Sequence, residues 1–98
     1  MKLSLNMKKH EVLDILEQKH SLKILVILLD GPMFKGELAS QITIGTASVQ
    51  SRVENLKQLG LLNEEEMKVK PFKKLISLTE KGSLVANHIK TIEEYLEQ

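Results

Sequence analysis

The sequence predicts a small α+β fold that is mostly α, and three observations support this. Apolar residues recur at helical spacing over most of the chain, and two such stretches within residues 34–60 are joined by a tight polar turn. Residues 61–78 carry weaker strand patterning around a proline, which indicates a β-hairpin. The 98 residues are enough to bury a core without a metal or disulfide. We therefore expect one domain over residues 1–98.

The chain before residue 34 predicts two helices and a short strand. The first helix runs from about residue 7 to residue 19, and Ser21 is the expected N-cap of the second. Residues 22–29 are apolar on nearly every face, so this second helix should be central and buried. The sequence Asp-Gly-Pro at 30–32 stops it. Residues 32–34 can then form a strand of one or two residues at the edge of a small sheet.

Residues 34–60 predict two short helices joined by a tight polar turn. Each helix has one apolar stripe, the first at Leu38, Ala39 and Ile42 and the second at Val49, Val53, Leu56 and Leu59. Gly45 is expected to supply the backbone angles of the reversal, and Thr46 to cap the second helix. Gly60 ends that helix.

The exposed face of the second helix carries small or hydrogen-bonding side chains and no bulky apolar group. A helix that faces only water more often carries Glu and Lys pairs there. A surface of this kind suits entry into a DNA major groove. The residues of this face are Thr46, Ala47, Ser48, Gln50, Ser51, Arg52 and Asn55.

The remaining chain predicts a hairpin over about residues 61–78 and a last helix over about residues 79–97. Leu61, Ile76 and Leu78 should anchor the two strands, and Pro71 should mark the tip. The first strand is expected to be short, because glutamates are poor strand formers. Four lysines cluster in the hairpin: Lys68, Lys70, Lys73 and Lys74.

Thr79 is the expected N-cap of the last helix. Gly82 weakens this helix by about 1 kcal/mol relative to alanine, unless a close contact requires a glycine there.

This order of elements resembles a winged helix-turn-helix, and three motifs carry the resemblance across about residues 22–82. ELASQI is similar to the usual opening of the first motif helix, and VENLKQLGLL to the end of the recognition helix. ISLTEKG is similar to the exit from the wing. The chain resembles compact bacterial and archaeal regulators of the MarR type. It has lysines and a proline where many MarR-type wings carry an Asp-x-Arg pair, and MarR proteins proper are longer at both ends.

The resemblance implies a sequence-specific, double-stranded DNA-binding transcriptional regulator, with repression by promoter occlusion as the usual route. Gln50 would pair with adenine and Arg52 with guanine. Arg52 has the alternative of a phosphate contact or an intramolecular salt bridge. The four hairpin lysines would contact the DNA backbone or the adjacent minor groove, and their alternative is a solvated hairpin tip.

A homodimer is expected, because one module reads only a few base pairs. Its two recognition helices would lie about 34 Å apart, one turn of DNA. The alternative is that the stripe on the last helix packs within the same chain, on the first helix. The predicted interface residues are Val12, Leu16, Val85, His88, Ile89, Ile92 and Leu96.

Other function classes find little support in the sequence. The net charge of +1 means that any DNA binding rests on local charge, and the absence of cysteine excludes disulfides and thiolate chemistry within these residues. His10, His20 and His88 are scattered, so we expect no metal and no other cofactor. Glu64, Glu65 and Glu66 point to different faces, which favours a solvated strand start over a catalytic cluster. We expect no enzymatic activity.

The longest apolar run, residues 24–29, is too short to span a bilayer, and the amino terminus lacks a signal-peptide core. We expect a cytoplasmic protein with no membrane partner. A winged helix that binds another protein is the second function class, since fold alone does not separate it from a DNA-binding one. The sequence identifies neither an effector nor the operator.

Overall fold

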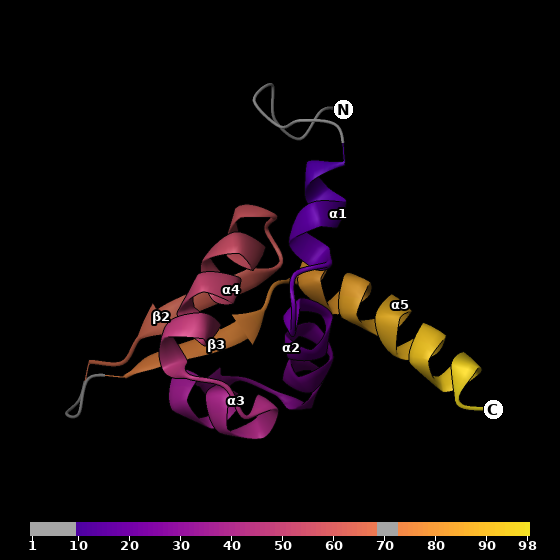
Figure 1. Cartoon of the computed structure of the whole chain (residues 1–98). Helices are drawn as coiled ribbons and strands as arrows, with labels where there is room; N and C mark the ends of the chain where they lie inside the picture. Colours follow the sequence, from indigo (N-terminus) through magenta and orange to yellow (C-terminus); the bar gives the residue numbers. More distant parts are fainter. Residues whose placement is uncertain (1–9, 69–72) are drawn as a thin grey trace.

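Five α-helices, a 3-10 turn and three strands make up the parts of the chain that the computed structural model describes, residues 10–68 and 73–98 (Figure 1). In chain order these are α1 (Glu11–Leu16), α2 (Ser21–Ile27), η1 (Leu28–Asp30), β1 (Met33–Phe34), α3 (Lys35–Ile42), α4 (Thr46–Gln58), β2 (Leu62–Glu66), β3 (Lys74–Leu78) and α5 (Glu80–Leu96). The predicted α+β fold, mostly α, is confirmed.

The central helix is α2, because apolar residues on several of its faces let helices pack around it. Ile24 and Leu25 are fully buried, and α1, α3 and α5 all contact α2. The predicted stop at residues 30–32 agrees with the structure, because the helical run ends at Asp30, but the predicted N-cap was wrong. Ser21 is already helical and its Oγ is buried without a partner among the described residues, while the N-cap position is taken by His20 with φ 75°. The last turn, Leu28–Asp30, tightens into a 3-10 helix.

The first helix, α1, ends at Leu16 rather than at Lys19 as predicted, because residues 17–20 form turns and His20 takes a left-handed conformation before α2. Its predicted beginning near Met7 lies outside the described residues.

The turn between α3 and α4 is made by Thr43 and not, as predicted, by Gly45. Thr43 has φ 53°, whereas Gly45 is extended with φ −73° and ψ 155°. The reversal comes directly after α3 because the amide of Ile44 donates back to the carbonyl of Ala39 at 3.2 Å. Gly45 is consequently the N-cap of α4, and Thr46 is its first helical residue instead of the predicted cap.

The sheet is antiparallel with strand order β1-β3-β2, so the expected two-residue strand pairs with the hairpin. Ile76 is fully buried and lies opposite Glu64. The prediction of a short first hairpin strand was wrong: β2 has five residues, as many as β3. Pairing along the whole length of β3 outweighs the poor strand propensity of the glutamates. Lys70 and the predicted tip at Pro71 lie outside the described residues.

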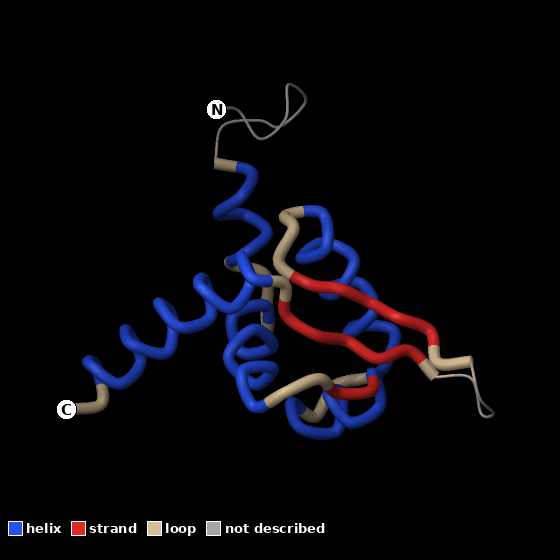
Figure 2. Tube along the Cα trace, turned by 180° about the vertical axis from the view of Figure 1, so that it is seen from behind, coloured by secondary structure: helices blue, strands red, loops and turns tan. Residues whose placement is uncertain are grey.

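The last helix, α5, begins as predicted and is joined closely to the hairpin. The hydroxyl of Thr79 accepts a hydrogen bond from the amide of Gly82 at 2.9 Å. A Cβ at Gly82 would lie 2.0 Å from the carbonyl oxygen of Leu61, so the close contact that justifies this glycine is present. The inner half of α5 packs on α2, and the outer half extends away from the other elements, on the opposite side of the molecule from the outer ends of β2 and β3 (Figures 1 and 2).

We predict that Gly82→Ala destabilises the protein by about 3 kcal/mol, because the added methyl overlaps a backbone carbonyl that cannot rotate away. Gly36→Ala is the matched control, since nothing lies within 4 Å of its Cβ position and it is also helical. The control should be neutral or stabilising by up to about 1 kcal/mol. Urea unfolding measures both, and equal stability of the two variants would contradict the packing described here.

Candidate nucleic-acid interface

The rotation of α4 about its axis is set by three fully buried residues, Val49, Val53 and Leu56. Because they form one stripe at helical spacing, the opposite face of α4 points away from the core. The exposed residues of α4 are Thr46, Ala47, Ser48, Ser51, Glu54 and Gln58. Four of the seven predicted groove-facing residues belong to this face, and the other three, Gln50, Arg52 and Asn55, are half-buried at its edges.

Two of these half-buried residues connect α4 to the segment between α1 and α2. The Nε of Arg52 donates to the carbonyl oxygen of Lys19 at 2.8 Å, and the Nδ2 of Asn55 donates to the Oε1 of Gln18 at 2.9 Å. Arg52 therefore makes an intramolecular contact. Its partner is a main-chain oxygen, so the contact is a hydrogen bond and not the salt bridge that the sequence analysis considered. Each bond holds α4 against the first part of the chain.

Positive charge gathers around this connection. The pKa of His20 is lowered by desolvation first and then by the charges of Lys19, Lys23 and Arg52. His20 is therefore neutral at pH 7, and the net charge beside this edge of α4 comes from the lysines and the arginine.

The third half-buried residue, Gln50, is bonded at both ends of its side-chain amide. Its Oε1 accepts from the Nζ of Lys35, the first residue of α3, at 2.5 Å. Its Nε2 donates to the Oε2 of Glu54, one turn further along α4, also at 2.5 Å. Adenine recognition by glutamine needs these same two atoms. In this structure Gln50 is therefore engaged within the protein.

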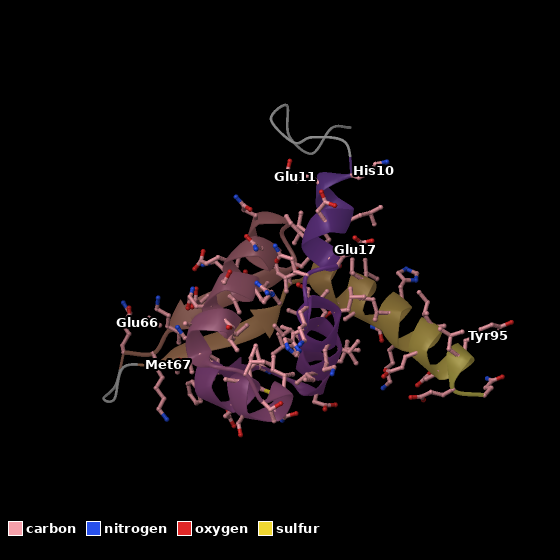
Figure 3. All side chains as sticks on the ribbon, in the orientation of Figure 1. His10, Glu11, Glu17, Glu66, Met67 and Tyr95 are labelled. Atoms are coloured by element: carbon pink, nitrogen blue, oxygen red, sulfur yellow. The ribbon has the colours of Figure 1, made fainter. Side chains whose placement is uncertain are left out.

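The hairpin presents its described lysines, Lys68, Lys73 and Lys74, to solvent. The Nζ of Lys73 lies 5.2 Å from the centre of the Phe34 ring, in cation–π geometry. Lys74 is opposite Glu66 in the strand register, so a carboxylate offsets part of its charge. Glu66 and Met67 lie at the outer end of the hairpin (Figure 3).

An ion pair that the sequence analysis missed joins α4 to the hairpin. The Nζ of Lys57 lies 3.0 Å from the Oε1 of Glu64, whose side chain is only 5% exposed. The prediction of a solvated Glu64 was therefore wrong, although Glu65 and Glu66 are exposed. The period of two along β2, which places Glu64 opposite the buried Ile76, was the available signal. The hydrogen bond from Lys57 to Glu64 raises the pKa of Lys57, and partial desolvation opposes it.

The predicted dimer residues divide into two groups. Val12, Leu16, Val85 and Ile89 are half-buried against the core of their own chain. His88, Ile92 and Leu96 are exposed, Ile92 by 58% and Leu96 by 75%. Tyr95 beside them is 73% exposed and points outward from α5 (Figure 3).

The stripe of α5 packs mainly on α2 rather than on the predicted first helix. A groove of about 500 Å³ remains between α2 and α5, and five of its seven lining residues are apolar. Its lining residues are Leu22, Lys23, Val26, Ile27, Ile89, Ile92 and Glu93.

Two further features concern the described residues as a whole. No group of three or more His, Asp or Glu side chains in residues 10–68 and 73–98 is placed to hold a metal ion. Within the same ranges, every helix is too short or too polar to cross a lipid bilayer.

Comparison with known proteins places this geometry in a family. A family model described as HxlR-like helix-turn-helix matches residues 15–98. No protein of curated function matches the sequence significantly. Among solved structures, the reduced form of the transcriptional regulator YodB from B. subtilis has a TM-score of 0.76 and 22% sequence identity, with 94% of this chain and 93% of that chain covered.

Two other solved structures extend the similarity. A MarR-family transcriptional regulator from Enterococcus faecalis V583 has a TM-score of 0.75 at 18% identity, covering 96% of this chain and 90% of that one. The transcriptional repressor BigR from Xylella fastidiosa has a TM-score of 0.71 at 26% identity, covering 89% and 84%. The resemblance to winged helix-turn-helix proteins of the MarR type is confirmed.

We predict that Asn55→Ala lowers the free energy of unfolding by about 1 kcal/mol, because the bond to Gln18 is lost. Ser48→Ala on the exposed face of the same helix is the control and should change stability by less than about 0.5 kcal/mol. Thermal or urea unfolding measures both. Asn55→Ala behaving like Ser48→Ala would show that Asn55 does not hold α4 in place.

Proposed function

The chain belongs to the HxlR-like helix-turn-helix family, and from this premise we propose that it binds double-stranded DNA sequence-specifically and regulates transcription as a homodimer. The observation that carries the proposal is the exposed face of α4. It presents a row of small side chains that a duplex can approach closely, while the opposite face is fully buried. A helix-turn-helix with this face covered would have no groove-reading surface.

We assign different roles to the residues of this interface. Thr46, Ala47, Ser48 and Ser51 face the bases of the major groove, where small side chains permit close approach. Arg52 and Asn55 keep α4 at a fixed position against the α1–α2 segment.

The hairpin lysines neutralise backbone phosphates, which supplies affinity without sequence preference. Lys68, Lys73 and Lys74 are exposed for this contact, and Lys70 joins them from its position in the sequence.

A second copy of the chain completes the DNA-binding unit. The outer half of α5 exposes Ile92, Tyr95 and Leu96, which form a continuous apolar edge beside the groove between α2 and α5. Packing of this edge on its twin removes apolar surface from water and sets two copies of α4 on one face of the duplex. His88 on the same helix would lie at the border of this contact.

Repression by occlusion is the simplest mode of regulation for a protein of this size, because a bound dimer blocks access of RNA polymerase to the promoter. The similarity to a protein described as a transcriptional repressor supports this direction of control. Since its ligand is chromosomal DNA, we place the protein in the cytoplasm.

The DNA-binding proposal predicts a steep salt dependence. Three phosphate contacts per subunit from Lys68, Lys73 and Lys74 correspond to a slope of log K against log salt of about −2.7 per subunit, so a dimer with both subunits seated on DNA should bind roughly 400-fold more weakly when salt is tripled. Fluorescence anisotropy of a labelled random-sequence duplex at 50 and 150 mM salt measures this. Lys68→Glu with Lys74→Glu should flatten the slope by about 1.8 or more.

Lys81→Glu is the control for that experiment, because Lys81 is exposed at the start of α5 beside Gly60, beyond the end of β3 opposite to the one that carries Lys74. It should leave the slope unchanged. A wild-type protein that fails to bind duplex even at 50 mM salt would overturn the proposal.

The dimer is tested separately. The wild-type chain should have a solution mass of about twice 11.1 kDa, and Ile92→Glu should lower it to that of one chain by placing a carboxylate in the apolar contact. Thr91→Glu, the adjacent exposed residue on the same helix, is the control and should remain dimeric. Sedimentation equilibrium gives both masses. A monomeric wild type across the micromolar range would contradict the proposed assembly.

One observation favours a second candidate function, a winged helix that binds another protein. The exposed face of α4 carries Glu54, and the hairpin carries Glu65 and Glu66, so the surface is less positive than its lysines alone imply. Carboxylates at these places repel phosphates. Absence of DNA binding at low salt would favour this reading.

A further inference from the structure

A recess of about 500 Å³ lies between the start of α3 and the start of β3, outside the recognition face of α4. Three of its six lining residues are lysines: Lys35, Lys73 and Lys74. The one carboxylate at its wall, Glu37, already accepts a hydrogen bond from the backbone amide of Phe34 at 2.9 Å. The recess is therefore lined by an excess of positive charge, with Phe34 as its apolar side.

Two of these lysines are held near the recess by contacts that do not neutralise their positive charge. Lys73 lies over the ring of Phe34, which attracts an ammonium group without neutralising it. Lys35 is half-buried and bonded to the uncharged amide oxygen of Gln50. Like charges that line one recess repel one another, and an anion placed among them removes that repulsion.

Lys35 also connects the recess to the recognition helix. Lys35 lines the recess, and its ammonium group donates to Gln50 on α4. Gln50 in turn donates to Glu54. A group that draws Lys35 into the recess would release the Oε1 of Gln50, one of the two atoms with which glutamine reads adenine.

We propose that this recess binds one phosphate of the DNA backbone, and that Lys35 moves from Gln50 to that phosphate when the duplex docks. The inference rests on the proposed DNA-binding function and deepens it. Contact with the backbone and release of a base-reading side chain then become one event, so Gln50 is available to a base only on a protein already seated on DNA. Lys35 belongs to α3 and not to the hairpin, and the sequence analysis did not consider it.

Lys35→Gln tests the proposal, because glutamine can still donate to Gln50 but carries no charge. In the anisotropy titration with random-sequence duplex, the slope of log K against log salt should become less steep by about 0.9 per subunit, the loss of one phosphate contact. Lys35→Arg should restore the wild-type slope. Lys81→Gln is the control and should not alter it. An unchanged slope for Lys35→Gln, with its unfolding temperature equal to that of the wild type, overturns the proposal.

A second measurement does not depend on DNA. Inorganic phosphate, titrated against chloride at constant ionic strength, should shift the backbone amide signals of Lys35, Gly36 and Lys73 and the side-chain amide signals of Gln50. Lys35→Gln should abolish the Gln50 shift. No phosphate-specific shift in the wild type overturns the site.

The two measurements also separate the proposals. A wild type that binds phosphate in the recess but no duplex would overturn both the DNA-binding function and the assignment of the recess to backbone phosphate, and a free phosphate compound would be the occupant. If the wild type binds duplex and Lys35→Gln has the same slope of log K against log salt, only the inference about the recess is overturned.

Discussion

The burial of Val49, Val53 and Leu56 is the constraint on which the rest of the interface depends. Three β-branched or leucine side chains in one stripe, all fully removed from water, contribute several kcal/mol and leave α4 a single rotation about its axis. Rotating α4 by half a turn about its axis would bury the small polar residues and expose this stripe. The packing of the core therefore determines which side chains of α4 are exposed to a ligand.

The same rotation explains why the candidate interface separates into supports and contacts. Residues at the edges of the exposed face lie within reach of neighbouring elements, so Arg52 and Asn55 bond to the α1–α2 segment and Gln50 to α3. Residues in the middle of the face, such as Ala47 and Ser51, are exposed in the described part of the structure. Support therefore comes from the long polar side chains, and close approach from the short ones.

Part of this arrangement could be predicted from the sequence, where it depends on neighbouring residues. Thr79 caps its helix and Gly60 takes φ 78° after α4, because both outcomes depend on adjacent residues. The sequence could not show that Arg52 bonds to a main-chain oxygen 33 residues away, since a carbonyl has no residue identity to read. Thr43 likewise makes the turn in place of Gly45, because closing the hydrogen bonds at the end of α3 requires the reversal two residues before the glycine.

The ion pair between Lys57 and Glu64 joins the two parts of the candidate interface, α4 and the hairpin. Glu64 is almost fully buried, and separation of α4 from β2 would leave its carboxylate without its cation, which is unfavourable in a site of low polarity. The ion pair therefore favours one position of α4 relative to the hairpin. In the proposed complex with DNA, phosphate contacts made by the hairpin and the recess fix where the exposed face of α4 meets the bases. In that proposed complex, the phosphate contacts of one element set the position of the other on the bases, and a chain with a net charge of only +1 would combine attraction to any duplex with preference for one sequence.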